Sequence, residues 1–146
     1  MDEGSILIVG VGGIGCKWSE RSHAKCQKMA DLLLVDADER SFLSSNSSHC
    51  LHLDANGNGM GSAALPNLAA HRFSEGLANI SELLEKSELV VILSALGGGT
   101  GSGAAPQIAA HAKQSGSLVI SIVGLPFVEQ PLRCAIAEIS LPSIEE

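Results

Sequence analysis

The sequence GGGTGSG occupies residues 97–103, between an apolar run and a helical pattern. The run before it reads LVVIL at 89–93, which is typical of a buried strand, and the pattern after it opens with Ala104-Ala105-Pro106. A strand, a glycine loop and a helix in this order present backbone N–H groups to an anion at the positive end of the helix dipole. No Lys follows the glycines, so the segment is not a P-loop, in which a Lys reaches the outer phosphates. The stretch therefore predicts a phosphate-binding loop of another kind.

A second glycine-rich segment reads GVGGIG at residues 10–15 and follows the apolar run ILIV at 6–9. It fits the G-x-G-x-x-G pattern, and Asp36 stands after the next apolar run, at 32–35. Taken alone, these features predict a Rossmann dinucleotide site with Asp36 on a ribose hydroxyl. The segment also resembles the ThiF/E1-like adenylating enzymes, in which a similar glycine turn is followed by D-x-D. Both alternatives stay open at this point.

Strand and helix patterns alternate along the chain. Apolar runs at 6–9, 32–35, 50–53, 89–93 and 118–123 predict strands, the third of them a short edge strand. Helices are expected from the first glycine loop to about Met29, from Pro66 through an apolar stripe, from residue 104 to Gly116, and from about Leu132; the stripe comprises Phe73, Leu77, Ile80 and Leu84. This order predicts an α/β fold, a Rossmann-like three-layer domain over residues 1–146 with a mostly parallel sheet. The two glycine loops then lie at one carboxyl edge and converge on one ligand.

Composition and charge exclude several kinds of function. The 146 residues carry a formal net charge of −7 and only 3% aromatic residues, which argues against binding to nucleic acid or to anionic membranes. The N-terminus is acidic and has no signal-peptide pattern, and the four cysteines show no C-x-x-C spacing, so a cytoplasmic protein is expected. The cluster His49-Cys50-Leu51-His52 with Asp54 is not favoured as a metal site, because residues 49 and 52 point to opposite faces of a strand.

The two loops together resemble the glycine segments of the tubulin/FtsZ family of GTPases. The segment GMGSAALP at 59–66 resembles the family's loop near the terminal phosphate, commonly G-L-G-A-G-x-N-P, although Ala63 stands at its later glycine and Leu65 at its Asn. LPF at 125–127, followed by Glu129 and Arg133, resembles the family's ribose-side loop. Cys16-Lys17 and Asp36-Ala37-Asp38 depart from the Asn-Asn and Asn-Thr-Asp that are common in the family.

This resemblance implies a site for GTP or GDP, with Mg²⁺ accompanying a triphosphate and held through water by Asp36 or Asp38. No catalytic residue and no direct metal ligand is expected within the chain. The nucleotide-binding residues that the resemblance implies are Gly12, Gly13, Ile14, Gly15, Cys16, Lys17, Gly61, Gly98, Gly99, Thr100, Gly101, Ser102, Glu129 and Arg133.

The resemblance covers only the N-terminal, nucleotide-binding part of the family. The family's central helix, second domain and activating loop have no counterpart in residues 1–146, so hydrolysis within a filament of this chain alone is not expected. We expect a cytoskeletal, cell-division type of GTP-binding protein that caps or modulates filaments of a full-length relative, or that self-associates. The alternatives are an adenylate-forming or NAD-binding enzyme and an inactive fragment of a GTPase.

Overall fold

A computed structural model describes residues 5–26, 29–43, 45, 47, 49–53 and 65–145. Its five strands form one sheet in the order β3-β2-β1-β4-β5. The strands are β1 (Ile6–Val11), β2 (Ala30–Asp36), β3 (His49–His52), β4 (Leu89–Ala95) and β5 (Leu118–Gly124). Every neighbouring pair is parallel, which confirms the predicted α/β class.

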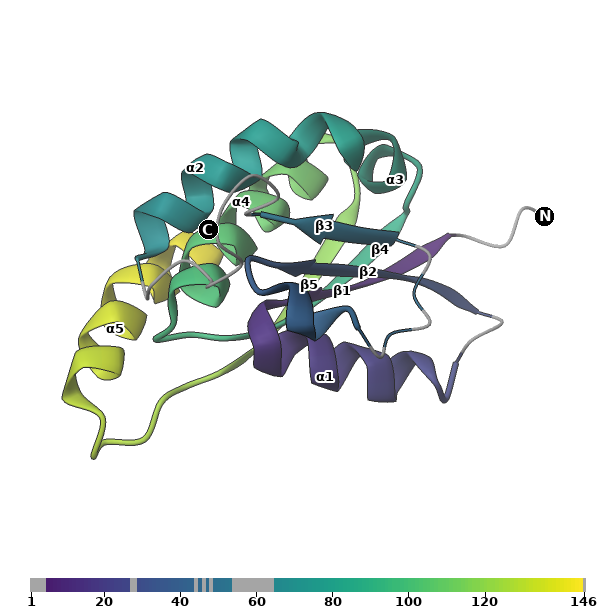
Figure 1. Ribbon diagram of the computed structural model, residues 1–146. Coiled ribbons are helices and arrows are strands. Elements are labelled where there is room, and N and C mark those ends of the chain that lie inside the picture. Colours follow the sequence, from purple (N-terminus) through teal and green to yellow (C-terminus); the bar gives the residue numbers. More distant parts are fainter. Residues whose placement is uncertain are drawn as a thin grey trace.

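Helices cover both faces of this sheet (Figure 1). They are α1 (Gly12–His23), α2 (Pro66–Gly76), α3 (Ser81–Glu85), α4 (Gly99–Gln114) and α5 (Pro131–Glu145), with 3₁₀ turns at Glu39–Ser41 and Leu77–Asn79. Helix α1 lies on one face, and α2, α3 and α4 lie on the other (Figure 1). The resulting layers are those of the three-layer architecture that the sequence predicts.

Two apolar clusters fill the space between the layers. The larger one lies under α2, α3 and α4 and includes Val9, Phe73, Leu84 and Ile108. The smaller one lies under α1; its buried members are Ile8, Cys16, Leu32, Leu34 and Leu93. The strands are almost continuously apolar because both of their faces are covered.

Helix α4 begins earlier than its sequence pattern indicates. It starts at Gly99 rather than at Ala104, after Gly98 in an extended conformation, and Pro106 therefore lies within the helix. A Cβ atom added to Gly101 or Gly103 would collide with backbone atoms of Ala95 or Pro66, so these glycines are packed helical residues. The prediction that residues 101–103 form an open loop is wrong, because their lack of a side chain serves close packing.

Two further helices differ from their predicted extents. Helix α1 ends at His23, not near Met29, and the His23 ring lies 2.9 Å from the Ala30 carbonyl oxygen at the start of β2. The apolar stripe after Pro66 is buried as expected at Phe73, Ile80 and Leu84, but it spans α2, a 3₁₀ turn and α3. The interruption follows Gly76, which packs against the Leu51 side chain.

Gly116 ends α4 as predicted. Its φ of 93° lies in the left-handed region, which glycine adopts without steric cost. The N–H groups of Gly116 and Ser117 donate to the carbonyls of Lys113 and Ala112 at 3.1 and 3.0 Å, the pattern of a Schellman C-cap.

Candidate functional site

A pocket of about 260 Å³ lies at the carboxyl ends of β1, β2 and β4. The beginnings of α1 and α4, the end of β2 and one side chain of α5 surround it; the lining residues are Val11, Gly12, Gly13, Ile14, Asp36, Ala95, Gly98, Gly99, Thr100, Gly101 and Arg133. The two glycine segments meet here, because a Cβ on Gly12 would lie 3.5 Å from the Gly101 nitrogen. The sequence-based expectation that both loops share one site is consistent with this geometry.

The end of β4 lies between the two glycine-rich helix starts. A Cβ on Gly15 would overlap the Leu93 carbonyl oxygen from the α1 side, and one on Gly101 would overlap the Ala95 carbonyl oxygen from the α4 side. Only glycine permits both approaches. These two residues therefore bring the N-termini of two helices to one pocket.

Both helix N-termini lack a side-chain cap. Neither Val11 before α1 nor Gly98 before α4 makes a capping hydrogen bond through its side chain, and the first turns contain no acidic residue. The N–H groups at the start of a helix have no intrahelical partner and carry the positive end of the helix dipole. Two such termini facing one pocket form a strong site for an anion.

Ser102 holds the second loop in shape. Its Oγ accepts a hydrogen bond of 2.8 Å from the Gly97 N–H, and its side chain is buried outside the pocket lining. Gly97 itself has a φ of 98°. Thr100, two residues before Ser102, is the hydroxyl residue that lines the pocket.

Cys16 and Lys17 lie differently from the residues that line the pocket. The Cys16 thiol is buried in the core and donates to the Gly10 and Val35 carbonyls at 3.6 and 3.8 Å. Burial raises the pKa of this thiol far above its ordinary value. A ligand in the pocket can thus meet only the backbone of Cys16. Lys17 is exposed and does not line the pocket.

Arg133 is the cationic side chain in the pocket lining. It comes from the first turn of α5, and its backbone lies against Gly97: a Cβ there would be 2.8 Å from the Arg133 carbonyl oxygen. Glu129 is exposed in the turn before α5 and does not line the pocket. Gly61, with most of the segment at 59–66, lies outside the described residues.

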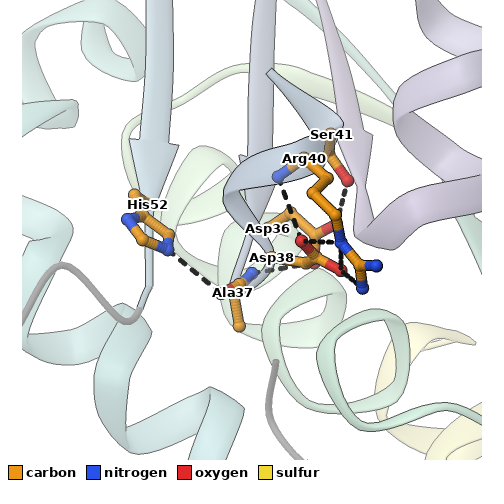
Figure 2. A network of polar contacts seen from close by, with 6 residues as sticks. All are labelled: Asp36, Ala37, Asp38, Arg40, Ser41 and His52. Carbon is orange, nitrogen blue, oxygen red and sulfur yellow. Dashed lines mark hydrogen bonds and ion pairs between the residues drawn. The ribbon is translucent and has the colours of Figure 1, made fainter. Parts of the chain in front are cut away.

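Asp36 places a carboxylate at the edge of the pocket. Figure 2 shows this side chain within a network of polar contacts. It is 4% exposed; one oxygen accepts a 2.7 Å hydrogen bond from the Ala37 N–H and the other accepts from the Ser41 hydroxyl. Its Oδ2 would lie 4.0 Å from a Cβ on Gly13. Asp36 is therefore held rigidly beside the start of α1.

Asp38 belongs to the neighbouring polar network and not to the pocket (Figure 2). It accepts hydrogen bonds from the Arg40 N–H at 3.0 Å and from Arg40 Nε at 2.9 Å. These bonds to the Arg40 guanidinium and backbone lower the pKa of Asp38 to about 2. The side chain thus caps the 3₁₀ turn at Glu39–Ser41.

Sequence reasoning missed two lining residues, Val11 and Ala95. Each is the last residue of a strand that leads into a glycine segment, and that position is the signal that identifies them. Within the described ranges, no group of three or more His, Cys, Asp or Glu side chains is arranged to hold a metal ion. Asp54, which completes the cluster at 49–52, falls outside those ranges.

The fold agrees with comparisons to known proteins. Residues 5–146 match the profile of the Tubulin/FtsZ family, GTPase domain. The chain is 34% identical over 123 residues to the cell division protein FtsZ of Mycoplasmopsis pulmonis, which covers 84% of this chain and 32% of that protein. It is 33% identical over 143 residues to FtsZ 1 of Archaeoglobus fulgidus, covering 97% of this chain and 39% of the relative.

Solved structures of FtsZ proteins are also similar to this chain. An empty FtsZ dimer from M. jannaschii superposes with a TM-score of 0.89 at 27% identity, covering 97% of this chain and 42% of that one. A mutant FtsZ from the same organism superposes with a TM-score of 0.88 at 26% identity, covering 98% and 44%. The parallel sheet with helices on both faces is thus the α/β fold of a GTPase domain. The chain belongs to the tubulin/FtsZ family and matches its GTPase domain.

The chain spans less than half of the length of these relatives, from 32% to 44%. Members of the family bind GTP. Among the described residues, no helix has the length and apolar character needed to cross a membrane.

Proposed function

We propose that this chain binds GTP and GDP, with the phosphates at the meeting point of the α1 and α4 N-termini. The observation that carries the proposal is the approach of Gly12 to Gly101, which points two uncapped helix starts at one pocket. Membership of a GTP-binding family supplies the nature of the nucleotide.

Each part of the site has a distinct role in this proposal. The backbone N–H groups of residues 12–14 and 98–101, which line the pocket, hold phosphate oxygens, with residues 15–17 continuing the first loop, and Thr100 adds a hydroxyl. Arg133 supplies a full positive charge and binds phosphate or ribose oxygens. The family resemblance adds Glu129, on the ribose side, and Gly61 to this proposed site.

Asp36 opposes an anionic ligand, since it brings a negative charge to the pocket edge. Both of its oxygens already accept hydrogen bonds within the chain. We therefore propose that Mg²⁺, bound with a triphosphate, is reached from Asp36 through water and offsets the repulsion. GTP binding should depend on Mg²⁺ more strongly than GDP binding.

Isothermal titration with GTP, GDP, ATP and NAD, each with and without Mg²⁺, tests the proposal. Selective binding of GTP and GDP is expected. The double variant Gly99→Val, Thr100→Ala should abolish it. Arg133→Ala should weaken it at least about tenfold, whereas the matched charge change Arg21→Ala, in the last turn of α1, should leave it unchanged.

The other outcomes of this titration are equally informative. Preference for ATP or NAD would replace the proposal with an adenylate-forming or NAD-linked enzyme. Absence of binding to all four nucleotides would leave an inactive fragment of a GTPase.

We also propose that the chain modulates or caps filaments of a full-length FtsZ-like relative. Its support is family membership together with a nucleotide pocket that opens at the surface of the described residues. Added below stoichiometric amounts to a polymerising FtsZ, the chain should reduce the polymer recovered by sedimentation. An unchanged pellet over a wide range of ratios would refute this role while leaving nucleotide binding intact.

A further inference from the structure

Two charged side chains are among the residues that line the pocket, and each lies beside a different helix start. A Cβ added to Gly13, in the first turn of α1, would lie 4.0 Å from Asp36 Oδ2. A Cβ added to Gly98, just before α4, would lie 4.0 Å from a guanidinium nitrogen of Arg133. The Asp36 carboxylate therefore opposes the positive end of the α1 dipole, whereas Arg133 reinforces that of α4.

The Asp36 carboxylate is held in place beside α1. It is 4% exposed, and its two oxygens accept hydrogen bonds from the Ala37 N–H and the Ser41 hydroxyl (Figure 2). A carboxylate on an exposed side chain would move into water, where solvent and salt screen its charge. The charge of Asp36 therefore acts on an anion in the pocket with little screening.

The hydrogen-bond partners of Asp36 do not neutralise this charge. Both groups that donate to it are uncharged. Asp38, two residues further on, shows the contrast, because it forms an ion pair with the Arg40 guanidinium at 2.5 Å. Of these two neighbouring carboxylates, the one that lines the pocket is thus the one without an arginine partner.

We propose that Asp36 selects between phosphate chains: without a divalent cation, the pocket takes a nucleoside diphosphate in preference to the triphosphate. The inference rests on the proposed function and extends it by assigning this discrimination to one side chain. A triphosphate brings an additional negative charge into a pocket of about 260 Å³ that Asp36 lines. Two like charges about 7 Å apart, at an effective dielectric constant of about 20, change a binding constant by more than about tenfold.

The Asp36 carboxylate favours the same triphosphate once Mg²⁺ accompanies it. It then faces a complex of lower negative charge, which it contacts through water. One side chain therefore disfavours the free triphosphate and favours its metal complex. The diphosphate, with less charge, responds less to the metal.

Titration calorimetry in the presence of EDTA measures this selectivity. The probes are GTP and GDP, together with inorganic tripolyphosphate and pyrophosphate, which have the same phosphate chains without base or ribose. The parent chain should bind GDP and pyrophosphate more tightly than GTP and tripolyphosphate. Asp36→Asn should raise the ratio of triphosphate to diphosphate affinity at least about fivefold for both pairs. An excess of Mg²⁺ in place of EDTA should reduce this difference between the two chains.

A matched variant separates the position of the charge from its amount. Asp31→Asn removes the same charge at the other end of β2, where the side chain is exposed, and should leave the ratio unchanged. The amide oxygen of Asp36→Asn can still accept from the Ala37 N–H, so the fold should be kept. Circular dichroism checks this, and Asp36→Ser, whose hydroxyl can also accept from that N–H, replaces Asp36→Asn if the latter does not fold.

Three results would overturn the inference. They are a ratio that Asp36→Asn leaves unchanged, a parent chain that prefers the free triphosphate, and an equal shift of the ratio in Asp31→Asn. Each of them leaves the proposed function intact as long as GTP and GDP bind. A shift for the two inorganic anions, with no binding of GTP or GDP, would refute the proposed nucleotide site and keep the selection of phosphate chains by Asp36. Binding of none of the four anions to any of the chains would refute both.

Discussion

The two glycine-rich segments look alike in the sequence, yet their glycines serve different purposes. In the first, Gly12 has a positive φ of 77° and a Cβ there would lie in ordinary van der Waals contact with Gly101, whereas Gly15 is packed against β4. In the second, Gly97 combines a positive φ with a close approach to Arg133, and Gly101 is packed against β4. Dense glycine therefore indicates close packing of helices as much as it indicates a phosphate-binding loop.

The largest effect on stability is expected where a new side chain in either segment meets the backbone of β4. Gly101→Ala and Gly15→Ala each place a Cβ against a carbonyl oxygen of β4. The better helix propensity of alanine raises the free energy of unfolding by at most about 1 kcal/mol, whereas overpacking against backbone lowers it by about 3 kcal/mol or more. Urea denaturation should show both variants strongly destabilised. A stability close to that of the parent chain in either variant would contradict the packing argument.

Gly97→Ala should cause the next largest loss of stability. A Cβ there would lie 2.8 Å from the Arg133 carbonyl oxygen, and the residue has φ of 98°. Strain in the left-handed region costs about 1–2 kcal/mol, and the collision adds about 1 kcal/mol.

Gly116→Ala provides the matched control for Gly97→Ala. Its φ of 93° is nearly the same, but a Cβ would meet nothing within 4 Å. The difference between the two free energies of unfolding therefore measures the collision with Arg133 alone. Equal losses in both variants would show that the approach of α5 imposes no constraint on Gly97.

Ser102→Ala should have a smaller effect that is confined to the second segment. It removes the acceptor of the Gly97 N–H, and a buried N–H without a partner costs about 1–2 kcal/mol. Because Gly97 lies against Arg133, binding of GDP should weaken as well. Urea denaturation and titration calorimetry measure the two effects, and Ser74→Ala, an exposed serine on α2, is the control. Unchanged stability would mean that the hydrogen bond does not hold the loop.

Much of the fold follows from the sequence, because apolar runs bounded by glycine identify parallel strands with both faces covered. The convergence of the two loops also follows, since parallel strands share a carboxyl edge. The start of α4 does not, because glycine is a poor helix former and only contacts with Ala95 and Pro66 explain its place in a helix. Those contacts join residues that only the tertiary structure brings together.

The candidate site, like the fold, could be predicted from the sequence only in part. Glycine loops and Arg133 are visible in the sequence as groups for binding an anion, and all lie at the pocket. The sequence does not show that the side chains of Cys16 and Ser102 face away from the pocket, since this depends on which face of each helix meets the sheet. The spacing of residues in a motif does not show which residues contact a ligand through their backbone and which have side chains that only hold the loop in place.

The smallest effect on stability is expected where the first segment borders the pocket. Gly13→Ala requires no positive φ, and the nearest atom to the new Cβ is Asp36 Oδ2 at 4.0 Å, so the free energy of unfolding should change by less than about 0.5 kcal/mol. Gly12→Ala, at φ 77° with its closest contact at 3.5 Å, should lose about 1 kcal/mol from strain alone. The effect of Gly13→Ala on GDP binding should be larger than its effect on stability. Gly13 lines the pocket, so the new methyl group takes space from a phosphate and weakens GDP binding in a fully stable protein. A Gly13→Ala variant that binds GDP like the parent chain would place the phosphates nearer to α4 than to α1.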